Sequence, residues 1–341
     1  MRIFTGVLVL VLAGWFLSAL VDAPEESAMA QSASPTEWIS SEQCAECHQE
    51  IYDEWISSPH ANSWNNEDVR VQSNHFAKQA CIDCHAPRPV FETKIGERVL
   101  PRPARRSEGV DCITCHLTPD GTMAGTITNP RAACQPVMRR ELQRVDLCAS
   151  CHNQHKTVEQ WKETPFADHR EGCMECHMPY RDGTPEGGRV HTMPGGHYIE
   201  MVRAAVELDA ERQDDGTVTV LLTNTSGHAY PTDERSRASD VWWRPVDDDG
   251  EPDGRWRHLH RIRDPYRHET DMVSTLLHYG EIRELELDDP AAQGSVEVML
   301  VYKRAPYYRD GNTGQPLRME DVDDPLEDAE LVHRAVVGPK L

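Results

Sequence analysis

The chain has 341 residues, of which 57 are acidic and 35 are lysine or arginine, giving a formal net charge of −22. This charge argues against nucleic acid as a partner, because affinity for nucleic acid depends on basic side chains that neutralise phosphates. Hydrophobic residues make up 38% of the chain and five residues are phenylalanine. A side-chain core for the whole length would therefore be thin, which leaves space for another group in the interior.

The first 30 residues are typical of a secretory signal peptide. Arg2 precedes an apolar run from Ile3 to Val21, and Ala28-Met29-Ala30 supplies a small-residue cleavage site. The run of 19 residues leaves an uncleaved membrane anchor as the alternative. No cysteine lies near the cleavage site, which argues against a lipid anchor. We therefore expect export to the periplasm or the cell exterior.

Ten of the eleven cysteines form five pairs separated by two residues, and a histidine follows each pair directly. The five motifs are Cys44/Cys47/His48, Cys81/Cys84/His85, Cys112/Cys115/His116, Cys148/Cys151/His152 and Cys173/Cys176/His177. The pattern predicts covalent attachment of five c-type haems, with two thioethers and one proximal histidine each. Zinc sites, thioredoxin-like sites and disulfides also use paired cysteines, but none of them needs a histidine after every pair.

Residues 31–200 are expected to form a pentahaem domain of short helices and long loops. Between residues 40 and 198 there are about 32 residues for each motif, enough only to wrap and ligate one haem. The macrocycles would replace the missing aromatic core. Cys134 lies outside the motifs, and we expect a buried free thiol, with an intermolecular disulfide or an unusual iron ligand as alternatives.

Twelve histidines remain beyond the five proximal ones, and six of these lie between residues 60 and 197. The pentahaem region could therefore ligate every iron with two histidines. His60 is the best candidate for a distal ligand, because it follows Pro59 at the end of a predicted helix with Tyr52 and Trp55 on one side. Since it cannot easily turn back to its own haem, a neighbouring haem is its expected target.

Other side chains could supply the remaining sixth ligands. The further distal candidates are His155, His191, His197 and, from the region after residue 200, His228. For His75 and His169, ligation and surface exposure are equally open. The competing sulfur ligands are Met123, Met138 and Met193, for which packing is the simpler interpretation.

From residue 201 onward the cysteines end and the hydrophobic pattern alternates with a period of two, which indicates strands. The predicted strands cover Val202–Leu208, Thr217–Thr223, Ala238–Trp243, Ile282–Leu287 and Ser295–Tyr302. We expect residues 201–341 to form an antiparallel β-sandwich of immunoglobulin-like architecture, which makes the fold class α+β. His228 lies on the loop after the second strand. Exposed side chains are expected for the last five histidines, His258, His260, His268, His278 and His333.

The segment from Cys44 to Ala61 resembles the first haem motif of the cytochrome c-554/c-prime-like family, and the motifs around Cys112 and Cys173 are also similar to it. The resemblance implies a multihaem electron carrier in which His60 caps another haem. Gly-His-Ala-Tyr-Pro-Thr, from residue 227, resembles the start of a β-domain found in several multihaem relatives. The chain departs from the tetrahaem namesake by one extra motif and by this domain.

We expect a periplasmic or extracellular electron-transfer protein that relays electrons between redox partner proteins. The alternative is a multihaem oxidoreductase that reduces nitrogen or sulfur oxyanions, such as nitrite or hydroxylamine, at one five-coordinate haem. Pentahaem nitrite reductases use a Cys-x-x-Cys-Lys site, which this sequence lacks. A third hypothesis gives the β-domain a docking role. Related extracellular cytochromes form filaments, which leaves a homo-oligomer or filament open.

Overall fold

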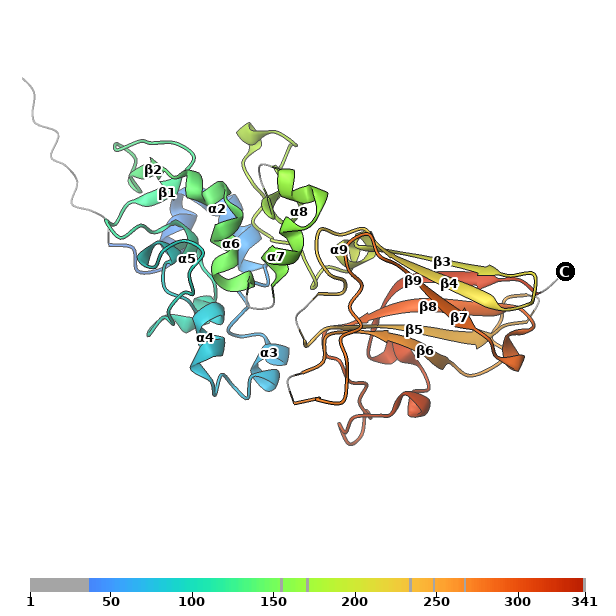
Figure 1. Ribbon diagram of the computed structural model, residues 1–341. Helices are drawn as coiled ribbons and strands as arrows, with labels where there is room; N and C mark the ends of the chain where they lie inside the picture. Colours follow the sequence, from blue (N-terminus) through green and yellow to red (C-terminus); the bar gives the residue numbers. More distant parts are fainter. Residues whose placement is uncertain are drawn as a thin grey trace, which may run out of the picture. The chain divides into compact units, whose positions relative to one another are not determined.

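Short helices separated by loops make up the first part of the computed structural model (Figure 1). The structure describes residues 37–339 except 154–155, 170–171, 233–234, 248 and 267. The predicted signal peptide therefore lies outside the described residues. The α-helices are α2 (Glu42–Ile56), α3 (Glu67–Gln72), α4 (Gln79–His85), α5 (Cys112–His116), α6 (Val145–His152), α7 (Thr157–Lys162), α8 (Met174–His177) and α9 (Ile199–Ala204).

The haem motifs determine where several of these helices end. Helices α4, α5, α6 and α8 each stop at the histidine of a motif, and α2 has non-helical backbone angles at His48. Short 3₁₀ turns complete the loops: η2 (Val90–Glu92), η3 (Arg106–Glu108), η4 (Arg140–Gln143), η5 (Pro165–Asp168) and η6 (Pro185–Gly187). A two-stranded parallel pair joins β1 (Met123–Gly125) to β2 (Pro136–Met138).

Seven antiparallel strands form a β-sandwich after α9. They are β3 (Val206–Arg212), β4 (Val218–Asn224), β5 (Ala238–Pro245), β6 (Arg257–Ile262), β7 (Ile282–Leu287), β8 (Val296–Lys303) and β9 (Glu330–Val337). One sheet has the order β3-β4-β7 and the other the order β6-β5-β8-β9. The α+β fold class with an antiparallel sandwich is thus confirmed, and α9 occupies the start of the predicted strand Val202–Leu208.

Apolar side chains from both sheets meet in the core of the sandwich, including Val220, Val241 and Leu300. A second cluster around Trp242 and Tyr308 lies under the segment after β8, which carries η8 (Met319–Asp321) and η9 (Pro325–Glu327). The turn η7 (Pro290–Ala292) precedes β8. Strand β8 is buried along its whole length because it lies at the centre of its sheet and is covered on both faces.

Both clusters of buried apolar side chains found in the described residues lie at or beyond Ile199. Residues 38–198 contribute only scattered buried apolar side chains to the interior, such as Trp55, Phe76 and Ile113. Residues 38–341 form one compact unit, and the predicted boundary after residue 200 falls inside α9. That boundary remains a prediction. No helix in the described part of the chain is long and apolar enough to cross a membrane.

Candidate haem-binding centres

The cysteines of different motifs contact one another. The thiols of Cys44 and Cys112 form a hydrogen bond that raises the pKa of Cys44 and lowers that of Cys112. A hydrogen bond to Cys173 likewise raises the pKa of Cys148. These contacts bring the first motif to the third and the fourth motif to the fifth.

The second and fourth motifs also meet, because a hydrogen bond between Cys84 and Cys151 raises the pKa of Cys151. Burial raises the pKa of Cys115 to about 12, and this thiol lies close enough to Cys148 and Cys151 to act on both electrostatically. No disulfide forms between the cysteines of the described residues. The five motifs therefore make one contiguous group, with the fourth motif near three others.

Two motif cysteines differ from the others in their exposure. Cys47 and Cys176 are exposed, whereas the other eight motif cysteines are half-buried. His48, directly after Cys47, is exposed as well. The buried side chain of α2 is Trp55, which lies eight residues further along, beyond the non-helical angles at His48. A thioether requires a reachable thiol and not a buried one, so attachment of the first haem through Cys47 stays a prediction.

Three motif histidines are oriented by backbone carbonyls. Nδ1 of His85 donates to Ser63 O at 3.0 Å, Nδ1 of His116 to Ala124 O at 2.8 Å and Nδ1 of His177 to Pro194 O at 2.6 Å. An imidazole that donates through Nδ1 keeps the lone pair on Nε2 for a metal. Burial lowers the pKa of His116 and so favours the neutral ring that ligation requires.

Three distal candidates lie at similar distances from motif histidines. The ring centroids are 6.5 Å apart for His116 and His191, and 6.3 Å for His177 and His228. The corresponding distance for His60 and His152 is 5.9 Å. If a metal–nitrogen bond is about 2 Å long and the ring centroid lies about 1.2 Å behind the nitrogen, an iron between two imidazoles separates the centroids by roughly 6.4 Å. The spacings fit iron held by two histidines.

Hydrogen bonds and burial prepare the distal candidates in the same way. Nδ1 of His191 donates to Arg189 O at 2.8 Å, and Nδ1 of His228 donates to Ala229 O at 3.0 Å. Burial lowers the pKa of His191 to about 4, lowers that of His60 to about 3, and lowers that of His228. All three rings are thus neutral at physiological pH and fit the role of iron ligands.

The other candidates have different surroundings. Nε2 of His197 lies 3.1 Å from Nη2 of Arg237, and burial lowers the pKa of His197 to about 4. His155 lies outside the described residues. His75 is exposed, and Nδ1 of His169 lies 2.8 Å from a carboxylate oxygen of Glu175.

Among the sulfur atoms, Met193 contacts Nδ1 of His60, whereas Met138 is exposed. Met123 lies in β1. Cys134 is half-buried and close enough to Cys44 to raise its pKa.

The prediction of exposed side chains was wrong for three histidines of the sandwich. His258, His260 and His333 are half-buried, whereas His268 and His278 are exposed. Nε2 of His258 lies 3.0 Å from the buried carboxylate of Asp240, and Nε2 of His333 lies 2.7 Å from Val206 O. These rings occupy β6 and β9, two strands that the sequence pattern did not predict. Neighbouring polar groups therefore hold His258 and His333 in the fold, whereas Nε2 of His260 has no hydrogen-bond partner among the described residues.

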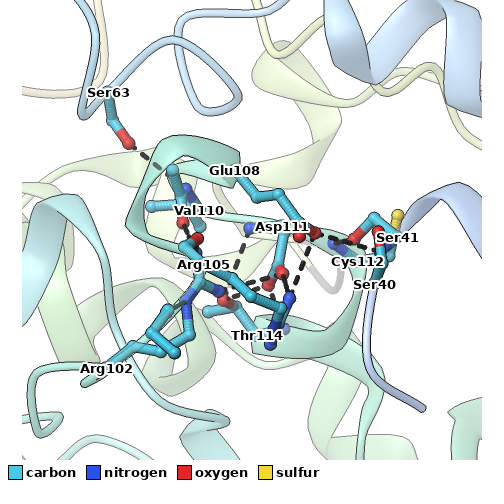
Figure 2. A network of polar contacts seen from close by, with 12 residues as sticks. Ser40, Ser41, Ser63, Arg102, Arg105, Glu108, Val110, Asp111, Cys112 and Thr114 are labelled. Carbon is cyan, nitrogen blue, oxygen red and sulfur yellow. Dashed lines mark hydrogen bonds and ion pairs between the residues drawn. The ribbon is translucent and has the colours of Figure 1, made fainter.

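A buried ionic network connects the first motif to the third (Figure 2). The carboxylate of Asp111 accepts from Thr114 N at 2.8 Å and so caps α5, the helix that carries the third motif. The guanidinium groups of Arg102 and Arg105 each lie 2.9 Å from that carboxylate. Asp111 and Arg102 have side chains that are 0% and 6% exposed. The carboxylate of Asp111 therefore joins the start of α5 to both arginines, and removal of either partner of such a buried pair is costly.

The same network reaches the start of α2. Glu108 accepts a hydrogen bond from Ser41 N at 3.0 Å, and Ser41 Oγ accepts one from Cys112 N at 3.2 Å. These residues were not identified from the sequence. The available signal was the unusual density of charge in Arg-Pro-Ala-Arg-Arg-Ser-Glu-Gly-Val-Asp, which ends directly before Cys112.

Comparisons with known proteins agree with this chemistry. Residues 43–117 match the sequence model of the family described as cytochrome c554 and c-prime. The fold is similar to that of a penta-haem cytochrome c552 from Thermochromatium tepidum, with a TM-score of 0.60, 20% sequence identity, and coverage of 88% of this chain and 98% of that one. The search of curated proteins gave no match.

A second solved structure, the DNA glycosylase AlkC from Pseudomonas fluorescens bound to DNA, has a TM-score of 0.20 at 12% identity, over 60% of this chain and 55% of that one. A TM-score this low does not indicate a shared fold. The five motifs and the family match over residues 43–117 support covalent haem attachment and an electron-transfer role of the kind found in multihaem c-type cytochromes, and the penta-haem structure shows a similar fold. Within that class, the stretch from the first to the third motif is similar to cytochrome c554 and c-prime.

Proposed function

We propose that this chain is an exported pentahaem electron carrier that binds one haem at each of its five motifs and relays electrons between redox partner proteins. The observation that carries the proposal is the pairing of motif histidines with second histidines at 5.9–6.5 Å between ring centroids. An iron with two histidine ligands changes oxidation state with little rearrangement and has no open position for a substrate. This arrangement favours electron transfer over catalysis.

The proposed ligand sets follow from these pairs. His116 and His191 hold the third haem, His152 and His60 the fourth, and His177 and His228 the fifth. The first and second haems take His48 and His85 as proximal ligands, and His155 and His197 remain candidates for further sixth ligands. When bound, the haems supply reversible one-electron chemistry at iron. The protein supplies thioether attachment, oriented imidazoles and exclusion of water from the buried rings.

Contacts between the motifs support a continuous relay. The contact of Cys44 with Cys112 connects the first and third positions, and that of Cys148 with Cys173 connects the fourth and fifth. Cys115, of the third motif, lies near the fourth motif and so joins the first pair of positions to the second pair. The second position joins the fourth through Cys84. Electrons could therefore enter at either end of the path without a large movement of the chain.

The exposure of the first motif suggests where a partner could exchange electrons. Cys47 and His48 are exposed on α2, so a haem attached there would have an edge near the protein surface. Electron transfer between proteins requires a short distance between the two redox groups. We therefore propose the first haem as an entry or exit point of the relay.

The charge of the chain indicates the kind of partner. With 57 acidic and 35 basic residues, the protein is steered toward basic surfaces at low ionic strength. We propose basic periplasmic redox proteins as donor and acceptor, and we expect the rate of their association to fall with added salt.

Low-temperature electron paramagnetic resonance of the oxidised holoprotein tests the proposed ligand sets. Replacing His228 with alanine should convert one low-spin ferric signal to high spin, because the iron ligated by His177 loses its sixth ligand. His278, an exposed histidine of the same sandwich, serves as the matched control, and its replacement with alanine should leave the spectrum unchanged. An unchanged spectrum for His228→Ala would refute the His177–His228 pair. Nitrite or hydroxylamine turnover at a high-spin haem of the unmodified protein would favour the reductase.

A further inference from the structure

A cluster of hydrogen-bond donors lies between the His177 region and the end of the sandwich. The hydroxyl of Tyr302, on β8, is buried and has no hydrogen-bond partner among the described residues. Arg237, just before β5, donates through Nη1 to Arg304 O at 2.8 Å and lies 3.1 Å from His197 through Nη2. Burying a hydroxyl without a hydrogen-bond partner costs free energy, so we expect the Tyr302 hydroxyl to have such a partner in the holoprotein.

The chemistry of these groups selects an anion. Two guanidinium groups and a phenol offer several donors, and guanidinium has no acceptor. Arg304 has a carboxylate partner in Glu330 at 3.5 Å, whereas no carboxylate pairs with Arg237 within the part of the chain that the structure describes. Burial raises the pKa of Tyr302, the positive charges of Arg237 and Arg304 oppose that rise, and the negative charge of Glu330, the partner of Arg304, adds to it. A planar carboxylate is the complementary ligand for such a set.

The backbone segment beside His177, the proposed proximal ligand of the fifth haem, lies close to this cluster. Pro194 O accepts from Nδ1 of His177 at 2.6 Å, and two residues later Gly196 lies against Tyr302. A Cβ atom added at Gly196 would lie 2.6 Å from the Tyr302 hydroxyl. The absence of a side chain at Gly196 therefore lets the backbone behind the proximal ligand approach the hydroxyl closely.

The segment that follows His228, the proposed distal ligand, also comes close to Tyr302. Tyr230 follows His228 by two residues, and the hydroxyl of Tyr230 accepts a hydrogen bond from Ser239 Oγ at 2.9 Å. Ser239 is the register partner of Tyr302 in the β5–β8 pair. The chain segments that follow His177 and His228 thus both come close to Tyr302.

We infer that Tyr302 and Arg237, with Arg304, form a carboxylate site that holds a propionate of the fifth haem. The inference rests on the proposed function, because that function assigns a haem to His177 and His228. Proteins orient a haem through its propionates as well as through its iron ligands. In c-type haem the propionates lie on the edge remote from the thioethers. The sandwich would then supply both the sixth ligand and the propionate anchor of one haem.

The test compares holoprotein variants by spectroelectrochemistry and resonance Raman spectroscopy. Arg237→Gln should lower one of the five midpoint potentials, because a positive charge near a haem favours the ferrous state. It should also shift the propionate bending band. Tyr302→Phe should shift the same band and the same potential by less, and Arg237→Lys should restore part of the potential. Tyr308→Phe is the control, since this hydroxyl is also buried but already pairs with Trp242 at 3.1 Å.

Two outcomes would overturn the inference. In the first, Arg237→Gln and Tyr302→Phe leave all five potentials and the propionate band unchanged. In the second, acetate or phosphate added to the unmodified protein shifts a potential, and Arg237→Gln abolishes that shift, which identifies a site for a free anion. The haem count of the unmodified protein is measured beforehand. A count below five would refute the proposed function itself, so the two failures are distinguishable.

Discussion

Replacement of Asp111 with alanine should destabilise the protein strongly. The change removes the cap of α5 at Thr114 N, worth about 1 kcal/mol in typical helices. It also leaves the Arg102 guanidinium, with a side chain that is 6% exposed, without its carboxylate at 2.9 Å. Removal of one partner from a buried ion pair costs about 3–5 kcal/mol. Arg102 keeps hydrogen bonds to three backbone oxygens, those of Ala104, Arg105 and Gly109. We therefore expect the free energy of unfolding to fall by about 4 kcal/mol in total.

Guanidinium titration of the holoprotein, followed by far-ultraviolet circular dichroism, measures this loss through the midpoint and slope of the transition. Asp146→Asn is the control, because Asp146 also lies just before a motif, two residues ahead of Cys148, but pairs with an Arg144 side chain that is 64% exposed. Its replacement should cost less than about 1 kcal/mol. Free energies of unfolding for Asp111→Ala and Asp146→Asn that agree within about 1 kcal/mol would refute a structural role for the buried pair.

Three further predictions follow from individual contacts. Gly109→Ala should lower the thermal midpoint, because Gly109 has φ +59° and an added Cβ would lie 2.4 Å from His60 O; an unchanged midpoint would contradict this. His60→Ala should convert one low-spin ferric signal to high spin in electron paramagnetic resonance, and retention of every low-spin signal would rule out its ligation. Burial raises the pKa of Asp240, but hydrogen bonds from Arg261 and His258 outweigh burial and hold it at about 2. Because the unfolded pKa is higher, about 2 kcal/mol of stability should be lost as pH falls from about 4 to about 2, and Asp240→Asn should abolish that loss in acid titrations.

The sequence predicts the chemistry of this protein better than it predicts which distant residues contact one another. The five motifs predict the attachment residues because thioether formation requires a fixed local spacing. Five strands were predicted from alternation, but β6 and β9 were not, because polar residues such as Arg261 and Arg334 interrupt the pattern. In the fold these two arginines pair with Asp240 and Glu297, respectively, and so remain compatible with a sheet.

The pairing of the candidate ligand histidines could not be derived from the sequence. His60 meets His152, and His177 meets His228, only after the chain has folded over long separations. No local spacing encodes those contacts, nor does it show that Cys47 is exposed. The role of Asp111 was also hidden, because a carboxylate before a helix indicates a cap but does not reveal two buried arginines around it.

The intact mass of the purified protein, made in a host with haem-ligation machinery, tests the central claim most directly. The account predicts the polypeptide mass plus five covalently bound haems, retained after denaturation in acid and organic solvent. A polypeptide that carries no added mass, or fewer than five haems, would contradict it.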